Sequence, residues 1–120
     1  MNDVIGLSLS HRDRLTPVAM LVAGGLGSRV DLDIDRIDDL QLALGLVLST
    51  LAPDERAELE FEPAEHGVTC RIGGLGPAVR EVLPSLERLV HHARLEGEQA
   101  HTITFQVEKR PAQGLAPPAA

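Results

Sequence analysis

The segment from Asp35 to Leu51 constrains the fold more than any other part of this sequence. After an acidic first turn it is apolar on almost every side, with Leu, Ala and Val at most positions from Leu40 onward. A helix of this composition must be covered on several sides, so it is predicted to lie at the centre of a domain. Asp35 is predicted to cap its N-terminus, and Asp38 to supply the carboxylate of a capping box.

Four segments in which apolar and polar residues alternate are predicted to form strands of one sheet. Each places its apolar side chains on a single face, which is typical of an antiparallel sheet covered by helices on one side. Two further helices are predicted, one from Asp13 to about Gly27 and one near Leu86 to Ala93. The predicted strands are Val4–Ser10, Glu58–Glu62, Val68–Ile72 and Thr102–Glu108.

The predicted element order is therefore βααββαβ. This order indicates an α+β two-layer sandwich, in which a mostly antiparallel sheet of about four strands carries three helices on one face. The chain has 120 residues, the usual size of one domain, so residues 1–110 are assigned to a single domain. Residues 111–120 are rich in Pro and Ala and are predicted to be a disordered tail.

Charge and composition disfavour several classes of function. Eleven basic and eighteen acidic residues give a formal net charge of −7, which opposes binding to nucleic acid or to an anionic membrane and points to protein partners. Aromatic residues make up 2% of the chain, so stacking on bases or sugars is not expected. The single cysteine, Cys70, fits a cytoplasmic protein, and no secretory signal or membrane span is expected.

The element order, together with the sequence I-D-R-I-D-D-L-Q-L-A-L at Ile34 to Leu44, resembles the anti-sigma-factor serine kinases of the RsbW type. These kinases are members of the histidine-kinase-like (GHKL) ATPase superfamily. The resemblance covers Ile5 to Arg110 and implies a GHKL ATPase-like domain that forms a homodimer. It also implies a protein partner, either a sigma factor or an antagonist of an anti-sigma factor.

The residues that carry catalysis in this family are replaced here. The family's second helix holds a glutamate as general base and, four residues later, an asparagine that binds magnesium. Alignment without gaps places Leu46 and Thr50 at these positions. Leucine cannot accept a proton, and a threonine hydroxyl is a poor substitute for an amide oxygen on Mg²⁺. Ile72 and Gly74 stand at the family's Asp-x-Gly motif for adenine, so the resemblance implies a pseudokinase that uses neither ATP nor Mg²⁺ and has no catalytic residue.

Gly73, Gly74 and Gly76 follow the third predicted strand and allow two interpretations. Their backbone N–H groups could cradle an anion or another small ligand. Alternatively, they form a turn in which at least one residue needs a positive φ. The turn is the more frequent role of such a cluster and is favoured.

Three residues are candidates for contact with a partner. Arg12 and Arg14 stand at the start of a predicted helix, the end less favourable for positive charge, which suggests that they meet an acidic partner. Met20 stands where the family has a partner-contacting arginine. His91 and His92 lack a further ligand at helical spacing, so no metal site is predicted.

Three functions remain open from the sequence. The favoured one is a non-catalytic GHKL-like regulatory module that acts by protein–protein binding, in the manner of an anti-sigma factor in a bacterial partner-switching pathway. The second is an ATP-dependent serine/threonine kinase with an atypical nucleotide site. The third is an unrelated structural or small-ligand domain.

Overall fold

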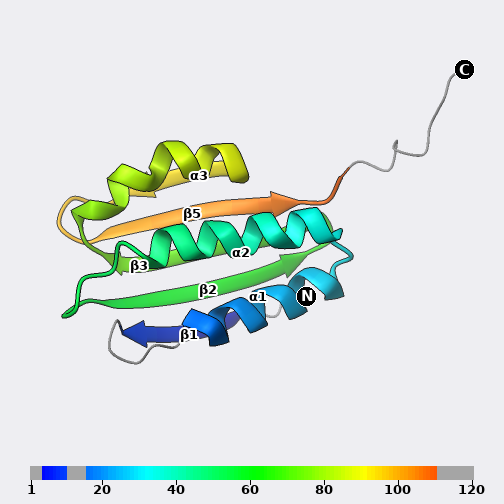
Figure 1. Ribbon diagram of the computed structural model, residues 1–120, viewed down its shortest axis with the longest axis horizontal. Coiled ribbons are helices and arrows are strands. Elements are labelled where there is room, and N and C mark those ends of the chain that lie inside the picture. The colour runs from blue at the N-terminus through cyan, green and yellow to red at the C-terminus, as the bar shows by residue number, and fades with distance from the viewer. Residues whose placement is uncertain (1–3, 11–15, 111–120) are drawn as a thin grey trace, which may run out of the picture.

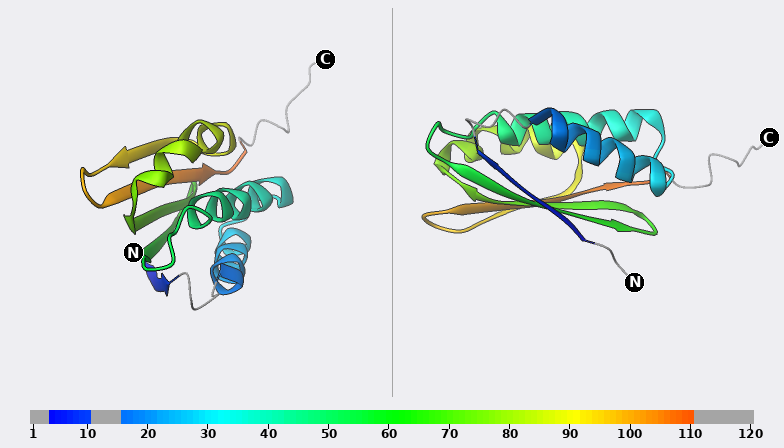
Figure 2. Two further views of the ribbon diagram at one scale, coloured as in Figure 1. Left: turned by 60° about the vertical axis from the view of Figure 1, so that its left-hand side comes forward. Right: turned by 90° about the horizontal axis from the view of Figure 1, so that it is seen from below.

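The computed structural model describes residues 4–10 and 16–110. Apolar and polar residues alternate along five strands, and these strands form one antiparallel sheet. All the helices cover the same face of this sheet, so the predicted two-layer α+β arrangement is confirmed (Figure 1; Figure 2, right). In chain order the elements are β1 (Ile5–Ser10), α1 (Thr16–Arg29), α2 (Ile34–Leu48), β2 (Arg56–Ala64), β3 (Gly67–Leu75), the 3-10 helix η2 (Pro77–Val82), α3 (Leu83–Leu89), β4 (His91–Glu96) and β5 (His101–Glu108).

The strands follow the order β1-β2-β3-β5-β4 across the sheet, so β1 and β4 are its two edges. Apolar residues face one another across neighbouring strands: Leu7 pairs with Leu59, and Leu59 in turn pairs with Ile72. A slip of one residue would turn every one of these side chains to the open face, so burial of one face fixes the register.

Helix α2 is the centre of the helical layer, as its sequence predicts. It lies between α1 and α3 above the sheet (Figure 1). Its side toward the sheet is fully buried, while a second side faces outward and carries exposed residues. The buried residues of α2 are Leu40, Ala43, Leu44, Val47 and Leu48.

The N-cap of α2 is Asp33 rather than the predicted Asp35. Asp33 has an extended backbone, and its Oδ1 accepts a hydrogen bond of 2.8 Å from the backbone N–H of Arg36. Arg110, just after β5, holds the same turn: its Nε lies 2.7 Å from Oδ2 of Asp33 and its Nη2 lies 3.3 Å from Oδ2 of Asp35. The predicted capping box with Asp38 is therefore wrong, because the helix begins two residues earlier.

Asp33 should make the stability of the domain depend on acid pH. The Arg36 N–H, with the charge of Arg110, lowers the pKa of Asp33 from its ordinary value of 3.8. A carboxylate whose pKa is lower in the folded than in the unfolded protein stabilises the fold at pH values above its ordinary pKa. This contribution is lost as the pH falls through the pKa of the folded state. Asn also caps helices but does not titrate. As the pH is lowered below 3.8, the free energy of unfolding of Asp33→Asn, measured by urea titration, should therefore fall less than that of the wild type. Identical losses in the two proteins would contradict this assignment.

The fifth strand, β4, occupies residues that were expected to continue the third helix. Helix α3 ends at Leu89, and Val90 is already extended, with φ −129° and ψ 177°. The following six residues alternate between half-buried and exposed, which is a strand pattern. The helix predicted near Leu86 to Ala93 is therefore wrong in its second half, and the observed order is βααββαββ.

Helix α1 begins at Thr16 and has Pro17 in its first turn. It buries only part of the stripe that its sequence predicts, which consists of Leu15, Val18, Ala19, Val22 and Leu26. Of these, Leu15 lies outside the described residues. The buried residues are the small Ala19 and Ala23, with Leu26 and Gly27. Small residues let α1 approach its neighbours closely: a Cβ at Gly27 would lie 2.9 Å from Cγ1 of Ile37 in α2.

Val18, which was expected in the buried stripe, is 40% exposed.

No helix in residues 4–10 and 16–110 is long and apolar enough to cross a membrane. The proposed tail at 111–120 lies outside the described residues.

Candidate functional site

An apolar groove of about 690 Å³ lies along α2 on the side opposite its buried residues, next to α1. Its α2 residues recur every three or four positions, so they share one face of the helix. Helix α1 contributes the side chain of Met20 from across the groove. The lining residues are Met20, Asp38, Gln41, Leu42, Gly45, Leu46 and Ser49.

The hollow shape follows from local sequence. Gly45 has no side chain, and a Cβ at this position would lie 3.4 Å from Cε of Met20, so the methionine closes over the glycine. Gln41 joins the two helices, because its Nε2 donates a hydrogen bond of 3.0 Å to the carbonyl oxygen of Met20. Leu42 is 58% exposed at the rim. Exposed apolar side chains grouped in this way are typical of surfaces that bind a protein, a membrane or an apolar ligand.

The charge at the groove is negative. Asp38 lies at one end of it, and the described residues that line the groove include no Lys or Arg. The groove therefore combines an apolar floor with an acidic end, which suits an apolar ligand that carries a basic group at one end.

Leu46, which the resemblance aligns with the family's catalytic glutamate, is half-buried and lines this groove. Thr50 lies one turn further on, where its hydroxyl donates a hydrogen bond of 2.7 Å to the carbonyl of Val47. Ser49 does the same to the carbonyl of Leu46, at 2.7 Å. Both hydroxyls therefore bond back to carbonyls of the helix three residues earlier.

Ile72 and Gly74 do not share a site with Leu46. The Ile72 side chain is fully buried in the core, whereas Leu46 opens to the outer groove. Gly73 and Gly74 lie within β3, which runs to Leu75 with an irregular register against β5. The predicted turn is therefore a bulge inside a strand.

The positive φ expected in this glycine cluster is present at Gly74, where φ is 79°. A Cβ there would overlap the carbonyl oxygen of Arg56 on β2, so the close approach of the two backbones requires glycine.

The space beside Gly76 is filled by a carboxylate of the chain itself. The Oε2 of Glu55 sits where a Cβ of Gly76 would be, and Oε1 of Glu55 accepts a hydrogen bond of 2.8 Å from the backbone N–H of Ala52. A second anion at Gly76 would meet this negative charge at close range. This contact favours a structural role of the glycine cluster over the anion-binding alternative.

Cys70 is fully buried, and burial raises the pKa of its thiol well above the ordinary value, which is typical of an unreactive core cysteine. His91 and His92 lie on β4 rather than on a helix. Nδ1 of His91 accepts a hydrogen bond of 3.3 Å from the backbone N–H of Glu108, and Nε2 of His92 lies 3.3 Å from Oε2 of Glu108. These contacts tie the edge strand to β5.

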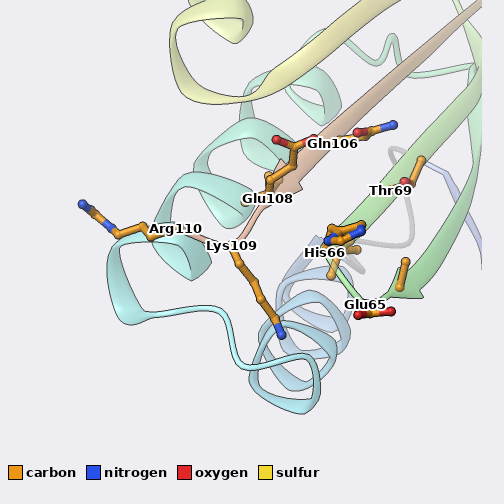
Figure 3. Close-up of a pocket in the computed structure, with 11 residues that line it drawn as sticks. Glu65, His66, Thr69, Gln106, Glu108, Lys109 and Arg110 are labelled. Carbon is orange, nitrogen blue, oxygen red and sulfur yellow. The ribbon is translucent and has the colours of Figure 1, made fainter. Parts of the chain in front are cut away.

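A second hollow, of about 600 Å³, lies at the turn between β2 and β3 beside the end of β5 (Figure 3). Its lining includes groups of both signs, among them Glu65, Glu108 and Lys109. Arg110 extends away from His66 in Figure 3, and its guanidinium is paired with Asp33 at 2.7 Å. Because the charged groups of this hollow are of both signs and do not converge, it favours neither an anion nor a cation. The groove beside α2 is therefore the better candidate site.

No protein-family model and no curated protein sequence matches this chain. The functional argument therefore rests on its residues and their geometry. Of the predicted partner contacts, Met20 lies in the groove, whereas Arg12 and Arg14 lie outside the described residues.

Leu42 and Gln41 were not singled out in the sequence. A helix that is apolar on almost every side does not reveal which leucine will remain exposed.

Proposed function

We propose that this chain is a non-catalytic, GHKL-like regulatory module that acts in the cytoplasm by binding another protein, in the manner of an anti-sigma factor. The observation that carries the proposal is the groove between α1 and α2, in which Met20 and Leu46 lie together. In the resemblance to the RsbW-type kinases, Met20 stands at a position that contacts the partner and Leu46 at the position of the general base. In this chain both side chains are apolar and line one binding surface.

The ligand that fits this groove is an amphipathic helix of a partner protein. A groove between two helices takes the apolar face of a third helix through side chains spaced three and four residues apart. Leu46 in the groove and Leu42 at its rim supply the apolar contacts, and Asp38 favours a Lys or Arg at one end of the bound helix. A sigma factor or an antagonist of an anti-sigma factor is the class of partner proposed.

The same residues argue against phosphoryl transfer. Kinase chemistry depends on a positioned carboxylate and on oxygen ligands for Mg²⁺. Leu46 offers neither. The hydroxyl of Thr50 donates a hydrogen bond to the carbonyl of Val47, and a neutral hydroxyl is a poor substitute for the amide oxygen on Mg²⁺. Ile72, at the family's adenine-contacting position, is buried in the core and cannot reach a nucleotide at the surface.

The test uses two charge substitutions at exposed leucines on different surfaces. Leu42→Glu places a carboxylate in the groove, and Leu21→Glu is the matched control on α1, where Leu21 is 77% exposed and outside the groove lining. A partner captured by the wild type should bind Leu42→Glu at least about 30-fold more weakly, the effect of losing a central contact. Its affinity for Leu21→Glu should be unchanged. Equal binding of both variants would contradict the proposal.

A second arm of this test addresses the kinase alternative. A ligand that binds only the folded state stabilises it, by about 2.7 kcal/mol at one hundred times its Kd. ATP with Mg²⁺ is therefore expected to leave the thermal unfolding midpoint of the wild-type protein unchanged. A clear rise with ATP would favour the kinase with an atypical site.

A further inference from the structure

Residues 111–120 follow directly on a part of the chain that is held at the start of α2. The end of β5 and the start of α2 lie at the same end of the domain (Figure 1). Nη2 of Arg110 lies 3.3 Å from Oδ2 of Asp35, in the first turn of α2. The backbone N–H of Lys109 donates a hydrogen bond of 2.8 Å to the carbonyl of His66. The point from which residues 111–120 start is therefore fixed.

This starting point lies on the same side of α2 as the groove. Residues on that side follow the spacing i, i+3, i+7, i+11 and i+14, so they form one stripe of the helix and its C-cap. They are Asp35, Asp38, Leu42, Leu46 and Ser49, and the last four line the groove. A segment that starts at Arg110 and follows the stripe therefore runs along the groove.

The lengths of the segment and of the groove agree. A polyproline-like chain advances about 3.1 Å per residue, so Leu115, five residues after Arg110, reaches about 16 Å from it. An α-helix rises about 1.5 Å per residue, so Gly45, ten residues after Asp35, lies about 15 Å along the axis. Leu115 can therefore reach the part of the groove where Gly45 has no side chain and Met20 lies opposite.

The composition of residues 111–120 suits this groove. They include no charged residue, and Leu115 is their one large apolar side chain, among Pro, Ala, Gly and Gln. Proline restricts φ, so the segment loses less conformational entropy when it docks. Lys109 and Arg110 come directly before it, on the side of the acidic groove end at Asp38. The chain thus carries its own apolar ligand with a basic group at one end.

We propose that residues 111–120 dock into the groove in an extended conformation, with Leu115 between Met20 and Gly45, and compete there with the partner protein. Because the segment is tethered at Arg110, its effective concentration at the groove is in the millimolar range, and a weak contact suffices to occupy the groove. The apparent dissociation constant of the partner rises as the fraction of free grooves falls. The competition rests on the proposed function, whereas the docking itself requires no partner.

The first experiment locates the segment by paramagnetic relaxation in the full-length chain. A nitroxide is attached to Gln113→Cys, and Cys70 should not react, because it is fully buried. The methyl signal of Met20 is recorded by NMR before and after the nitroxide is chemically reduced. If the segment lies in the groove, the Met20 signal should be lost while the label is paramagnetic and should return after reduction.

Three substitutions in the labelled chain test which contacts hold the segment. Leu115→Ser removes its large apolar side chain, and Leu42→Glu places a carboxylate in the groove, so each should restore most of the Met20 signal. Leu21→Glu adds the same charge outside the groove lining and should leave the loss unchanged. A Met20 signal that is lost equally in Leu115→Ser, or that is retained in all chains, would overturn the proposal.

The second experiment uses a synthetic peptide of residues 109–120 as the probe. Added at millimolar concentration to unlabelled full-length Leu115→Ser, it should shift the Met20 methyl signal towards its wild-type position. The wild-type protein should respond much less, because its own segment fills the groove. Equal responses of the two proteins, or none in Leu115→Ser, would overturn the proposal. Both experiments omit the partner, so a failure of docking is distinguishable from a failure of the proposed function.

Discussion

Replacing Phe61 by alanine is expected to remove a large part of the stability of the domain. Phe61 is fully buried in β2, where it pairs with Ile5 on β1 and with Cys70 on β3. Removing a buried phenylalanine costs about 3–5 kcal/mol, because the lost transfer energy adds to the cost of the cavity. A domain of this size is stable by about 5–15 kcal/mol, so this one substitution removes a large part of the total. Urea unfolding followed by circular dichroism measures the loss.

The aliphatic composition of the core makes this effect larger. Phe61 and Phe105 are the only two phenylalanines, and the chain has no Trp or Tyr. Phe105 lies two strands away across Cys70, so the residues paired directly with Phe61, Ile5 and Cys70, are not aromatic and fill little of the cavity. Phe61→Leu is the matched control, because it keeps most of the volume and should cost much less, about 1.5 kcal/mol or less. Equal losses for the two variants would show that packing around Phe61 is not what stabilises the sheet.

The second large effect is expected at the turn between β2 and β3. Gly67 has a φ of 150°, and a Cβ there would overlap the carbonyl oxygen of Val107 on β5. Gly67→Ala therefore combines an unfavourable backbone conformation, about 1–3 kcal/mol, with a contact to backbone that cannot move aside. We expect a loss of at least about 3 kcal/mol in urea unfolding, together with faster amide exchange at the adjoining ends of β2 and β3.

Gly73→Ala is the control for this substitution in the same strand. A Cβ at Gly73 would lie 3.4 Å from Oγ1 of Thr102, an ordinary contact with a side chain. Its effect on stability should be smaller than about 1 kcal/mol, in the range of strand propensities. If the two glycines tolerate alanine equally well, the close approach of Gly67 to β5 has no energetic role.

The strands with simple alternation and the central helix could be predicted, because burial of one face leaves a periodic signal in the sequence. Strand β4 was missed for a related reason. Leu86, Leu89 and Val90 have helical spacing, and this pattern runs directly into the alternation of β4 with no glycine or proline between them. The N-cap was misplaced because Asp33 and Asp35 are equally good capping residues. In the structure Asp33 accepts the hydrogen bond from the Arg36 N–H, and Arg110, which comes from the end of β5, lies 2.7 Å from Asp33 and 3.3 Å from Asp35.

The chemistry of individual side chains follows from the sequence: a leucine at position 46 cannot act as a base, and a single cysteine cannot form an internal disulfide, whatever the fold. Exposure does not follow in the same way. Leu42 and Leu44 are both leucines in one apolar helix, yet one is 58% exposed in the groove and the other is completely buried. The same holds for Ala19 and Leu21 in α1, where the smaller residue is the buried one. Which surface an apolar residue faces depends on the elements that pack around it, and these come from distant parts of the chain. The groove therefore emerges only from the tertiary structure.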